Sequence, residues 1–284
     1  MVLEDMVIPE SMECHPSRML IVGFIYSTLG IFLGYFVFGK YASISGIFLT
    51  TMPLVVIVYR TIRYEECKDL EIKKEYPLLK EHMKALSVFI YLFIGMALSY
   101  SMWFTFLPEN MVKVICDSQI ETVTSVRGSM SATGQFMGLS SKFELILLNN
   151  LRVLGFCILF SFLYGSGAIF ILTWNASVIG VAMGDIVKTG LKNVASYSNM
   201  DFLYAYFQTF PMSLTYLVHG IPEITAYFTA ALGGGIISIA VARHHYASED
   251  FKHIVLDSVQ LLLLSVVILV IAAFIEVYIT PVLF

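Results

Sequence analysis

The chain alternates between long apolar runs and shorter polar connections. Five of the runs contain no Asp, Glu, Lys or Arg over at least 18 residues. Runs of this length are typical of helices that span a membrane, because about 20 helical residues cross the hydrocarbon core. The five predicted spanning helices comprise residues 19–39, 41–59, 85–107, 153–174 and 258–275.

A sixth apolar block, residues 202–242, contains only two side chains that can carry charge, His219 and Glu223. Its 41 residues would form a helix of roughly 60 Å, about twice the thickness of the hydrocarbon core. The block must therefore break at one of its prolines or glycines, and we expect a short helix up to about residue 217 followed by a span over about 222–242. The sequence thus predicts an all-α polytopic transmembrane helical bundle of about six helices with one broken or re-entrant segment.

Composition and charge exclude several classes of protein. Apolar residues make up 58% of the chain and charged residues 13%, a composition typical of a membrane protein in contact with lipid. The net charge of −4 argues against a nucleic-acid partner. The cysteines lie in four different regions without CxxC spacing, so no zinc site, disulfide framework or cofactor is expected. They are Cys14, Cys67, Cys116 and Cys157.

Basic residues predict the orientation of the chain in the cell membrane. Residues 60–84 contain seven Lys or Arg, whereas the longer segment 108–142 contains three. Because positively charged loops tend to stay in the cytoplasm, the N-terminus and the 60–84 loop are predicted to be cytoplasmic. Six crossings would return the C-terminus to the cytoplasm, but a re-entrant hairpin within 202–242 would reverse the last helix, and both alternatives stay open. The acidic tail at residues 1–18 does not resemble a cleavable signal peptide.

Two polar segments are candidate surfaces for protein partners. The 60–84 loop mixes seven basic with six acidic residues and is interpreted as a solvated helical hairpin tip, with docking of a cytoplasmic partner as the alternative. The 108–142 segment is expected to form one surface helix over about 110–127, followed by a loop. We accordingly divide the chain into residues 1–84, with the tail, a helical pair and the charged loop, and residues 85–284, the main transmembrane domain.

Polar residues crowd the entry to the predicted span 153–174. Glu144, Asn149, Asn150 and Arg152 fall within nine residues of sequence. One interpretation places them at the membrane interface, with Arg152 extending towards water and the amides capping the helix. In the other, the helix starts near residue 143 and the group forms part of a polar core.

Three further residues are candidates for capping or catalysis. Asn175 is a good helix cap, so the chain is expected to turn there. Ser166, between two glycines, could pair with His219 as the dyad of an intramembrane hydrolase, although small residues in a spanning helix more often serve close packing. Asp185 follows Gly184 as in two-aspartate proteases, but the pattern lacks its first glycine and a convincing second aspartate. The HExxH zinc motif is absent from the sequence.

The pentapeptide HGIPE at residues 219–223 carries the charge of the sixth apolar block. An ionisable residue in such a setting usually marks a buried polar centre of a membrane protein. Pro222 suits the first position of a helix, where the helix dipole would favour the Glu223 carboxylate. Structural contact, ion or proton handling and catalysis all stay open. The hypothesis that His219 and Glu223 bind a metal is weakened, because the proline between them disturbs the helix face that residues i and i+4 would share.

Three motifs together resemble the stage II sporulation protein M family of integral membrane proteins. They are LNNL at 148–151, WNASVIG at 174–180 and VHGIPEITA at 218–226. The resemblance covers roughly residues 85–284, and the chain departs from the family in its extra helical pair at 19–59 and in Val218, where the family often has proline. The resemblance implies a membrane component of an envelope-remodelling or scaffolding complex, which in sporulating bacteria works with cell-wall hydrolases.

Two functions follow as hypotheses. The first is a non-enzymatic membrane scaffold or assembly component, oligomeric through its glycine-bearing helices and organised around a polar centre. The second is a transporter or channel in which Glu223 and His219 bind a cation or proton, since discontinuous helices near intramembrane charges are typical of such sites. The predicted polar centre comprises Asn149, Asn150, Arg152, Asn175, His219 and Glu223, with Glu144, Ser166 and Asp185 as secondary candidates.

Overall fold

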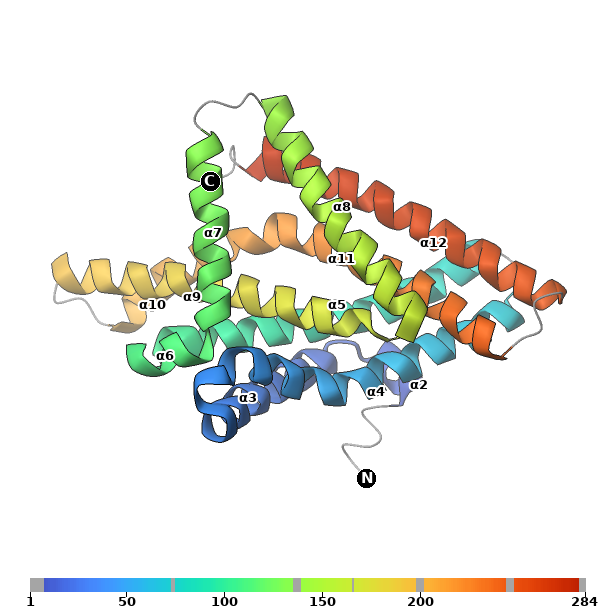
Figure 1. The fold of residues 1–284 in the computed structure, drawn as a ribbon, viewed down its shortest axis with the longest axis horizontal. Helices are drawn as coiled ribbons and strands as arrows, with labels where there is room; N and C mark the ends of the chain where they lie inside the picture. Colours follow the sequence, from blue (N-terminus) through green and yellow to red (C-terminus); the bar gives the residue numbers. More distant parts are fainter. Residues whose placement is uncertain are drawn as a thin grey trace.

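The computed structural model describes residues 8–72, 75–134, 139–164, 166–197, 202–243 and 248–280, and within these ranges it is helical without a strand. Six helical stretches are long and apolar enough to cross a membrane, and the first of them contains two helices, α3 and α4. The polytopic all-α bundle predicted from the sequence is thereby confirmed (Figure 1). In chain order the elements are α2 (Pro9–Cys14), α3 (Arg18–Phe38), η1 (Gly39–Tyr41), α4 (Ala42–Glu71), α5 (Glu75–Phe106), α6 (Glu109–Ile115), α7 (Asp117–Gly134), α8 (Leu139–Tyr164), α9 (Ala168–Tyr197), α10 (Phe202–Ser213), α11 (Thr215–Arg243), α12 (Glu249–Phe274) and the π-helical turn η2 (Ile275–Ile279).

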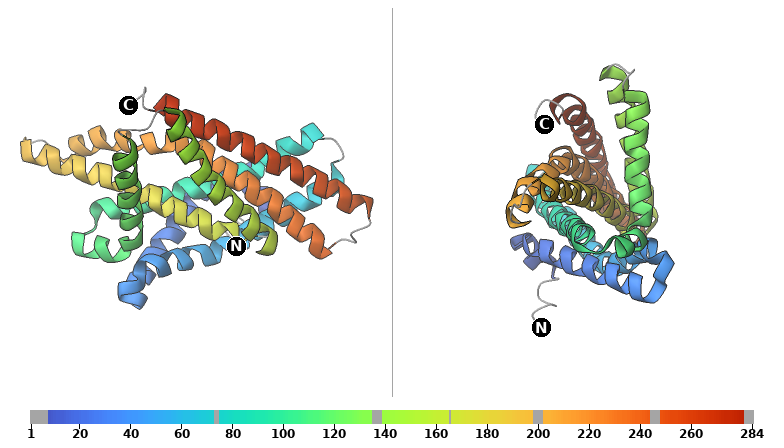
Figure 2. Two further views of the ribbon diagram at one scale, coloured as in Figure 1. Left: turned by 45° about the horizontal axis from the view of Figure 1, so that its top comes forward. Right: turned by 90° about the vertical axis from the view of Figure 1, so that its left-hand side faces the viewer.

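Helices α5, α9 and α11 form the interior of the bundle, and the remaining long helices surround them (Figures 1 and 2). Among the 18 most apolar consecutive residues of each stretch, 78% are buried in the α11 stretch but 22% in the α8 stretch. Helix α8 therefore presents mostly apolar side chains outwards, as a lipid-facing helix does. The core joins α5 to α11 through aromatic contacts, such as the stacked rings of Phe89 and Phe228 with centroids 5.2 Å apart.

Glycines allow the helices to approach closely. A Cβ at Gly30 would overlap the Thr50 side chain of α4, and one at Gly95 would overlap the backbone carbonyl of Leu20 in α3. Gly180 likewise places α9 against the backbone of α5 at Ala97. These small-residue faces are thus occupied within one chain. The expectation of an oligomer formed through the glycine-bearing helices stays a prediction, for which Gly155 of α8, with no atom within 4 Å of an added Cβ, is still accessible.

The turn between α3 and α4 depends on Gly39. This residue has a φ of +52°, in the left-handed region that only glycine adopts at little cost. Helix α4 then runs back along α3. It is thirty residues long, contains Pro53 and ends at Glu71. The extra N-terminal helical pair therefore forms a tight hairpin that packs on α5.

Glycine also divides the predicted span 153–174, which is wrong as a single helix. Helix α8 ends at Tyr164, Ser166 and Gly167 lie in the connection, and α9 starts at Ala168. The Gly-Ser-Gly sequence gives the backbone the freedom to leave the helix, which outweighs the continuous apolar pattern. Asn175 consequently lies inside α9, so its expected role as a cap at a turn is also wrong.

The apolar block 202–242 breaks as predicted, but at a different place. Helix α10 ends at Ser213 and α11 begins at Thr215, just after Pro211. The HGIPE pentapeptide therefore lies within α11, and Pro222 occupies the helix interior instead of its first position. Proline lacks the N–H donor of one hydrogen bond to the preceding turn and its ring crowds the carbonyl there, but packing against neighbouring helices can compensate for this cost.

The segment after α5 contains two helices where one surface helix was expected. Helix α6 ends at Ile115, and α7 leaves it at a steep angle and packs on α9 and α4 (Figures 1 and 2). The wholly buried Gln119 fixes the start of α7, because Ser43 of α4 donates a 2.7 Å hydrogen bond to its Oε1 and its Nε2 donates to Ser177 of α9 over 3.3 Å. Residues 135–138 of the predicted 108–142 segment lie outside the described residues.

Candidate functional site: a buried ionic cluster

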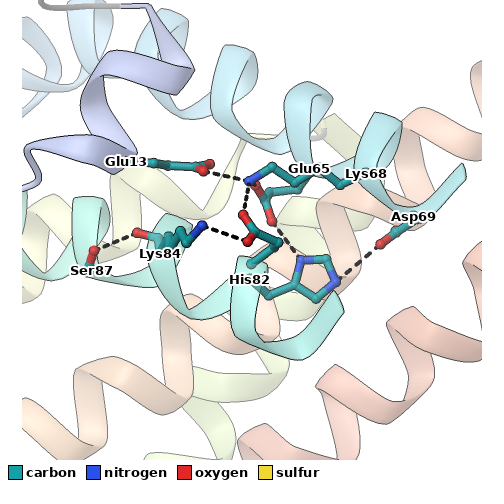
Figure 3. A network of polar contacts seen from close by, with 8 residues as sticks. Glu13, Glu65, Lys68, Asp69, His82, Lys84 and Ser87 are labelled. Carbon is teal, nitrogen blue, oxygen red and sulfur yellow. Dashed lines mark hydrogen bonds and ion pairs between the residues drawn. The ribbon is translucent and has the colours of Figure 1, made fainter. Parts of the chain in front are cut away.

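Five ionisable side chains from three helices meet at the end of the bundle where α4 stops and α5 starts (Figure 3). Glu65 and Asp69 of α4 and His82 of α5 are at most 2% exposed. Lys68 of α4 and Glu13 of α2 complete the group, which we call the ionic cluster. The interpretation of the 60–84 loop as a solvated hairpin tip is therefore wrong for these residues.

The helical period of α4 explains why these charges are buried. The inward positions recur every three or four residues, from Leu54 through Val58 and Ile62 to Glu65 and Asp69. The same face of α4 thus carries apolar side chains in its middle and charged ones at its end. Because the neighbouring helices cover this face along its whole length, the charges must find partners inside the protein.

His82 joins α5 to α4 through both of its ring nitrogens. Nδ1 lies 2.7 Å from Oε2 of Glu65, and Nε2 lies 3.2 Å from Oδ1 of Asp69. The contact of Nδ1 with Glu65 is a hydrogen bond, whereas Nε2 and Asp69 make an ion-pair contact when the ring is protonated. The imidazole ring thus lies between two carboxylates of the neighbouring helix.

Lys68 links the cluster to the N-terminal helix. Its Nζ lies 2.5 Å from Oε2 of Glu13, 2.7 Å from Oε1 of Glu65 and 3.3 Å from Oε2 of Glu81. The pair of Glu81 with Lys84, at 2.6 Å, continues the network to the surface (Figure 3). A single ammonium group thereby connects α2, α4 and α5.

Glu13 is the member of the cluster that lies before the spanning helices. Burial, followed by the hydrogen bond to Glu65 and the negative charge of Glu65, raises the pKa of its carboxyl to about 8, against the attraction of Lys68. Two carboxylates beside one ammonium favour retention of a proton. We therefore expect the docking of α2 to depend on pH.

Two ion pairs extend the polar end of the bundle to α11 and α12. Arg243, the last residue of α11, places Nη1 2.8 Å from Oε2 of the buried Glu66. His253 and Asp257 of α12 lie 2.8 Å apart, and the charge of Asp257 acts on Asp69. Ion pairs thus tie four helices together at this end, α2, α4, α5 and α11, whereas the charges of Asp257 and Asp69 repel each other.

The predicted polar centre has a different layout. In α8, Asn150 is 6% exposed, whereas Glu144, Asn149 and Arg152 face outwards. Because α8 begins at Leu139, these residues lie inside a helix, yet only Asn150 points into the bundle. Neither interpretation of this group, an interfacial cap or a full polar core, describes it completely.

The remaining candidates are distributed over α9 and its start. Asn175 donates through Nδ2 to the carbonyl of Ile171, one turn earlier, at 2.8 Å. Ser166 is buried in the connection before α9, and Asp185 interacts electrostatically with Lys188, one turn later. Asn175 and Asp185 do not meet at one point, since they lie ten residues apart on the same helix.

Glu223 has a partner on its own helix. The Tyr227 hydroxyl donates a 2.7 Å hydrogen bond to Oε1 of Glu223, and the Tyr227 side chain is fully buried. Glu276 of η2 also lies near enough to interact electrostatically with Glu223. The His219 side chain lies outside the described part of the chain, so its pairing with Glu223 or Ser166 stays a prediction.

The sequence contains a pattern that predicts part of the ionic cluster, although the many charged residues of the 60–84 loop suggest a solvated segment. Positions 54, 58, 62, 65 and 69 continue one helical stripe, and this continuity predicts that Glu65 and Asp69 face inwards with the apolar residues. His82 lies on a similar stripe of α5 with Leu78, Ala85 and Phe89, but the sequence does not predict its pairing with α4, because the distance between the two helices depends on tertiary packing. Across the described ranges, no group of three or more His, Cys, Asp or Glu side chains is placed to hold a metal ion.

Comparison with known proteins adds an independent observation. The profile of the family described as stage II sporulation protein M matches residues 85–281, more than half of the chain. The chain belongs to the stage II sporulation protein M family. This confirms the resemblance carried by the three sequence motifs, and the match begins at α5, after the N-terminal hairpin.

An archaeal relative shares this similarity. An uncharacterized protein of Methanocaldococcus jannaschii is 32% identical over 148 residues, which cover 49% of this chain and 71% of the relative. No solved structure matches the chain. Family membership and the apolar helices establish a multi-pass membrane protein of the stage II sporulation protein M family.

Proposed function

We propose that this family member is a membrane scaffold, an assembly component of an envelope-associated complex. The observation that carries the proposal is the attachment of the start of α7 to α4 and α9 by hydrogen bonds. Gln119 joins this helix to α4 and α9, and the amide of Ser118 donates to Ser43 over 3.2 Å. A polar helix fixed in this way offers a defined surface for a partner, as a scaffold requires.

The proposed partner surface is the outer face of α7. Glu121 and Thr124 are exposed there, one turn apart, beyond the anchoring Gln119. The second surface is the tip of the α4–α5 hairpin, where Tyr76 is 80% exposed. The family resemblance favours a partner in the envelope for the first surface and a cytoplasmic one for the second.

The proposed orientation places the ionic cluster on the cytoplasmic side of the cell membrane. The N-terminus and the 60–84 segment share this side because seven basic residues lie there. Arg243 brings the end of α11 to the same side, and α12 then runs back towards the start of α8, where the rings of Phe143 and Tyr278 lie 6.5 Å apart. The C-terminus would accordingly lie outside, and residues 1–84 and 85–284 would act as joined units of one bundle.

Site-specific photocrosslinking in native membranes tests the scaffold proposal. A crosslinking residue at Glu121 or Thr124 should capture the same partner, whereas one at the lipid-facing Leu148 of α8 should not. Gln119→Leu, which removes both anchoring hydrogen bonds, should abolish capture at Glu121 while the protein still inserts. Capture that is equal at Leu148, or deletion of either polar segment without loss of a partner, would count against the proposal.

A cation or proton transporter is the second candidate. It is favoured by the intramembrane carboxylate of Glu223, which has Tyr227 as a neutral partner and Glu276 nearby. Glu223→Gln and His219→Ala should each abolish flux into liposomes. Unchanged flux in both variants would eliminate this function. Homo-oligomerisation is compatible with either candidate and can be measured by the mass of the detergent-solubilised protein.

A further inference from the structure

Helix α8 has one face buried in the bundle and the opposite face open. It lies at the outside of the bundle and packs mainly on α11 (Figures 1 and 2). Its buried stripe is formed by Asn150, Leu154, Cys157 and Ser161, which are at most 6% exposed. Arg152 lies on the opposite side of the helix from this stripe and is exposed. Neither the proposed scaffold surfaces nor the transporter candidate uses this outward face.

Arg152 lies where a charge is costly in a membrane. It is the fourteenth of the 26 residues of α8, so its Cα is about 18–20 Å along the axis from either end of the helix. Arginine side chains extend to water only near the ends of a spanning helix, and those in the middle of a span almost always have a partner. A guanidinium keeps its proton in proteins. The positive charge of Arg152 therefore requires a counter-charge at this depth.

The part of the chain that the structure describes offers no such counter-charge. Arg152 makes no hydrogen bond or ion pair with the described residues. Glu144 is two turns earlier in α8, about 12 Å away along the axis. Glu223 of α11 accepts its hydrogen bond from Tyr227 of its own helix. The structure therefore leaves the compensation of Arg152 to a neighbouring molecule.

The surroundings of Arg152 suit a packed helix. Gly155, one turn later, has no atom within 4 Å of an added Cβ, so the backbone of α8 is open to close approach. Leu148, Phe156 and Leu159 surround this position and are 58%, 49% and 48% exposed. A helix placed here would bury these apolar side chains together with the charge. A lipid phosphate does not reach Arg152, because headgroups lie outside the hydrocarbon core.

We propose that the outward face of α8 binds a transmembrane helix of another protein that carries an Asp or Glu in the middle of its span, paired with Arg152. Ionisable residues within spanning segments commonly pair with one another, and a carboxylate accepts two parallel hydrogen bonds from a guanidinium. A second copy does not fit this face, because copies inserted in the same orientation would bring Arg152 against Arg152 in a parallel pair of α8 helices. The inference does not depend on the scaffold surfaces. The face includes Leu148, which should not capture the partner of Glu121, so the bound helix belongs to a different protein.

Binding of a synthetic transmembrane peptide to the full chain tests this proposal. The peptide is a run of about 20 leucines with lysines at both ends and Glu, Gln or Leu at its centre. Energy transfer between a dye on the chain and a dye on the peptide, both in phosphatidylcholine vesicles, measures binding. The Glu peptide should bind saturably and at least about tenfold more tightly than the Gln peptide, whereas the Leu peptide should give only the background of random encounters. Equal binding of the Glu and Leu peptides would overturn the proposal.

Three variants locate the contact. Arg152→Leu, which suits a lipid-facing position, should reduce binding of the Glu peptide to the level of the Leu peptide. Gly155→Leu fills open space and should weaken binding about tenfold, because the two helices can no longer approach closely. Leu263→Ala, on the lipid-facing side of α12 and 64% exposed in the natural sequence, is the matched control and should leave binding unchanged. Full binding of the Glu peptide by Arg152→Leu would contradict the assignment of this face.

Two further measurements distinguish the other occupants of the face. If a second copy covers it, Arg152→Leu should halve the mass of the detergent-solubilised protein and leave peptide binding unchanged. If an anionic headgroup covers it, phosphatidylglycerol vesicles should abolish binding of the Glu peptide. Either result would refute the proposal, whereas an unchanged mass in Arg152→Leu and equal binding of the Glu peptide in both lipids would support it.

Discussion

The protein buries carboxylates in two regions, and the two regions satisfy them differently. At the end of α4, Glu65 and Asp69 are held by His82 and Lys68, so positive and negative charges from different helices compensate each other. In the middle of the bundle, Glu223 accepts a hydrogen bond from the neutral Tyr227 of its own helix. The first arrangement connects helices, whereas the second leaves a carboxylate whose charge can change without breaking an ion pair between helices.

The comparison predicts that the ionic cluster contributes more to stability than Glu223 does. His82→Ala would leave two buried carboxylates without their shared cation, and loss of one partner of a buried ion pair typically costs about 3–5 kcal/mol. Thermal unfolding in detergent, followed by circular dichroism, measures the effect. Lys84→Ala at the exposed end of the same network is the control and should have a small effect. A loss in His82→Ala no larger than in Lys84→Ala would show that the cluster is not structural.

Glu223→Gln should have a smaller effect on stability, within about 1 kcal/mol. Glutamine keeps the shape of the side chain and an oxygen that accepts from the Tyr227 hydroxyl, so one hydrogen bond is retained. The same unfolding measurement applies, with Tyr227→Phe as the variant that removes the hydroxyl donor. If Glu223→Gln were as destabilising as His82→Ala, the proposed contrast between the two regions would be wrong.

The docking of α2 should weaken as pH rises. The pKa of Glu13 is about 8 in the docked state and 4.5 as its ordinary value, so between these two pH values docked Glu13 holds a proton that free Glu13 lacks. Docking is thus fully favoured below about pH 4.5, weakens through this window and stays at its weaker level above about 8. Limited proteolysis before Arg18 measures it, and Glu13→Gln should remove the pH dependence. Cleavage that is independent of pH in the natural sequence would contradict the raised pKa.

An exposed ion pair should contribute least. Lys252 and Glu249 of α12 are 2.6 Å apart, but their side chains are 59% and 87% exposed. Water screens such a pair, and measured contributions of exposed pairs are about 0–1 kcal/mol. Lys252→Ala should therefore leave the unfolding temperature nearly unchanged, in contrast to His82→Ala. A large loss would mean that the distance between charges, and not burial, determines the ranking.

Much of the fold could be predicted from the apolar runs, because a membrane requires long continuous helices. The two errors in helix boundaries come from glycine and proline. The glycines flanking Ser166 end α8 within an apolar run, whereas Pro222 is accommodated inside α11. At these positions the sequence combines residues that tend to break a helix with an apolar pattern that favours one. Packing against neighbouring helices determines whether the helix continues.

The candidate site could be predicted only in part. The stripe on α4 that ends in Asp69 is visible in the sequence. Charged residues near a loop are usually solvated, however, and this general rule wrongly predicts that Glu65 and Asp69 are exposed. The burial results from α2, α11 and α12, which converge on the end of α4 from distant parts of the chain. The contact of Glu223 with Tyr227 is an i, i+4 pair and is therefore accessible to sequence reasoning, whereas its proximity to Glu276 depends on the packing of α11 on α12.

A double-mutant cycle between His82 and Asp69 tests the central claim most directly, since it isolates the interaction that joins α5 to α4. The free energy of unfolding is measured for the natural sequence, His82→Gln, Asp69→Asn and the double variant. A buried, directly paired couple should show a coupling energy of about 1–3 kcal/mol, so that the double variant is less destabilised than the sum of the single ones. Additive effects, with a coupling energy near zero, would contradict the account of an ionic cluster that holds this end of the bundle together.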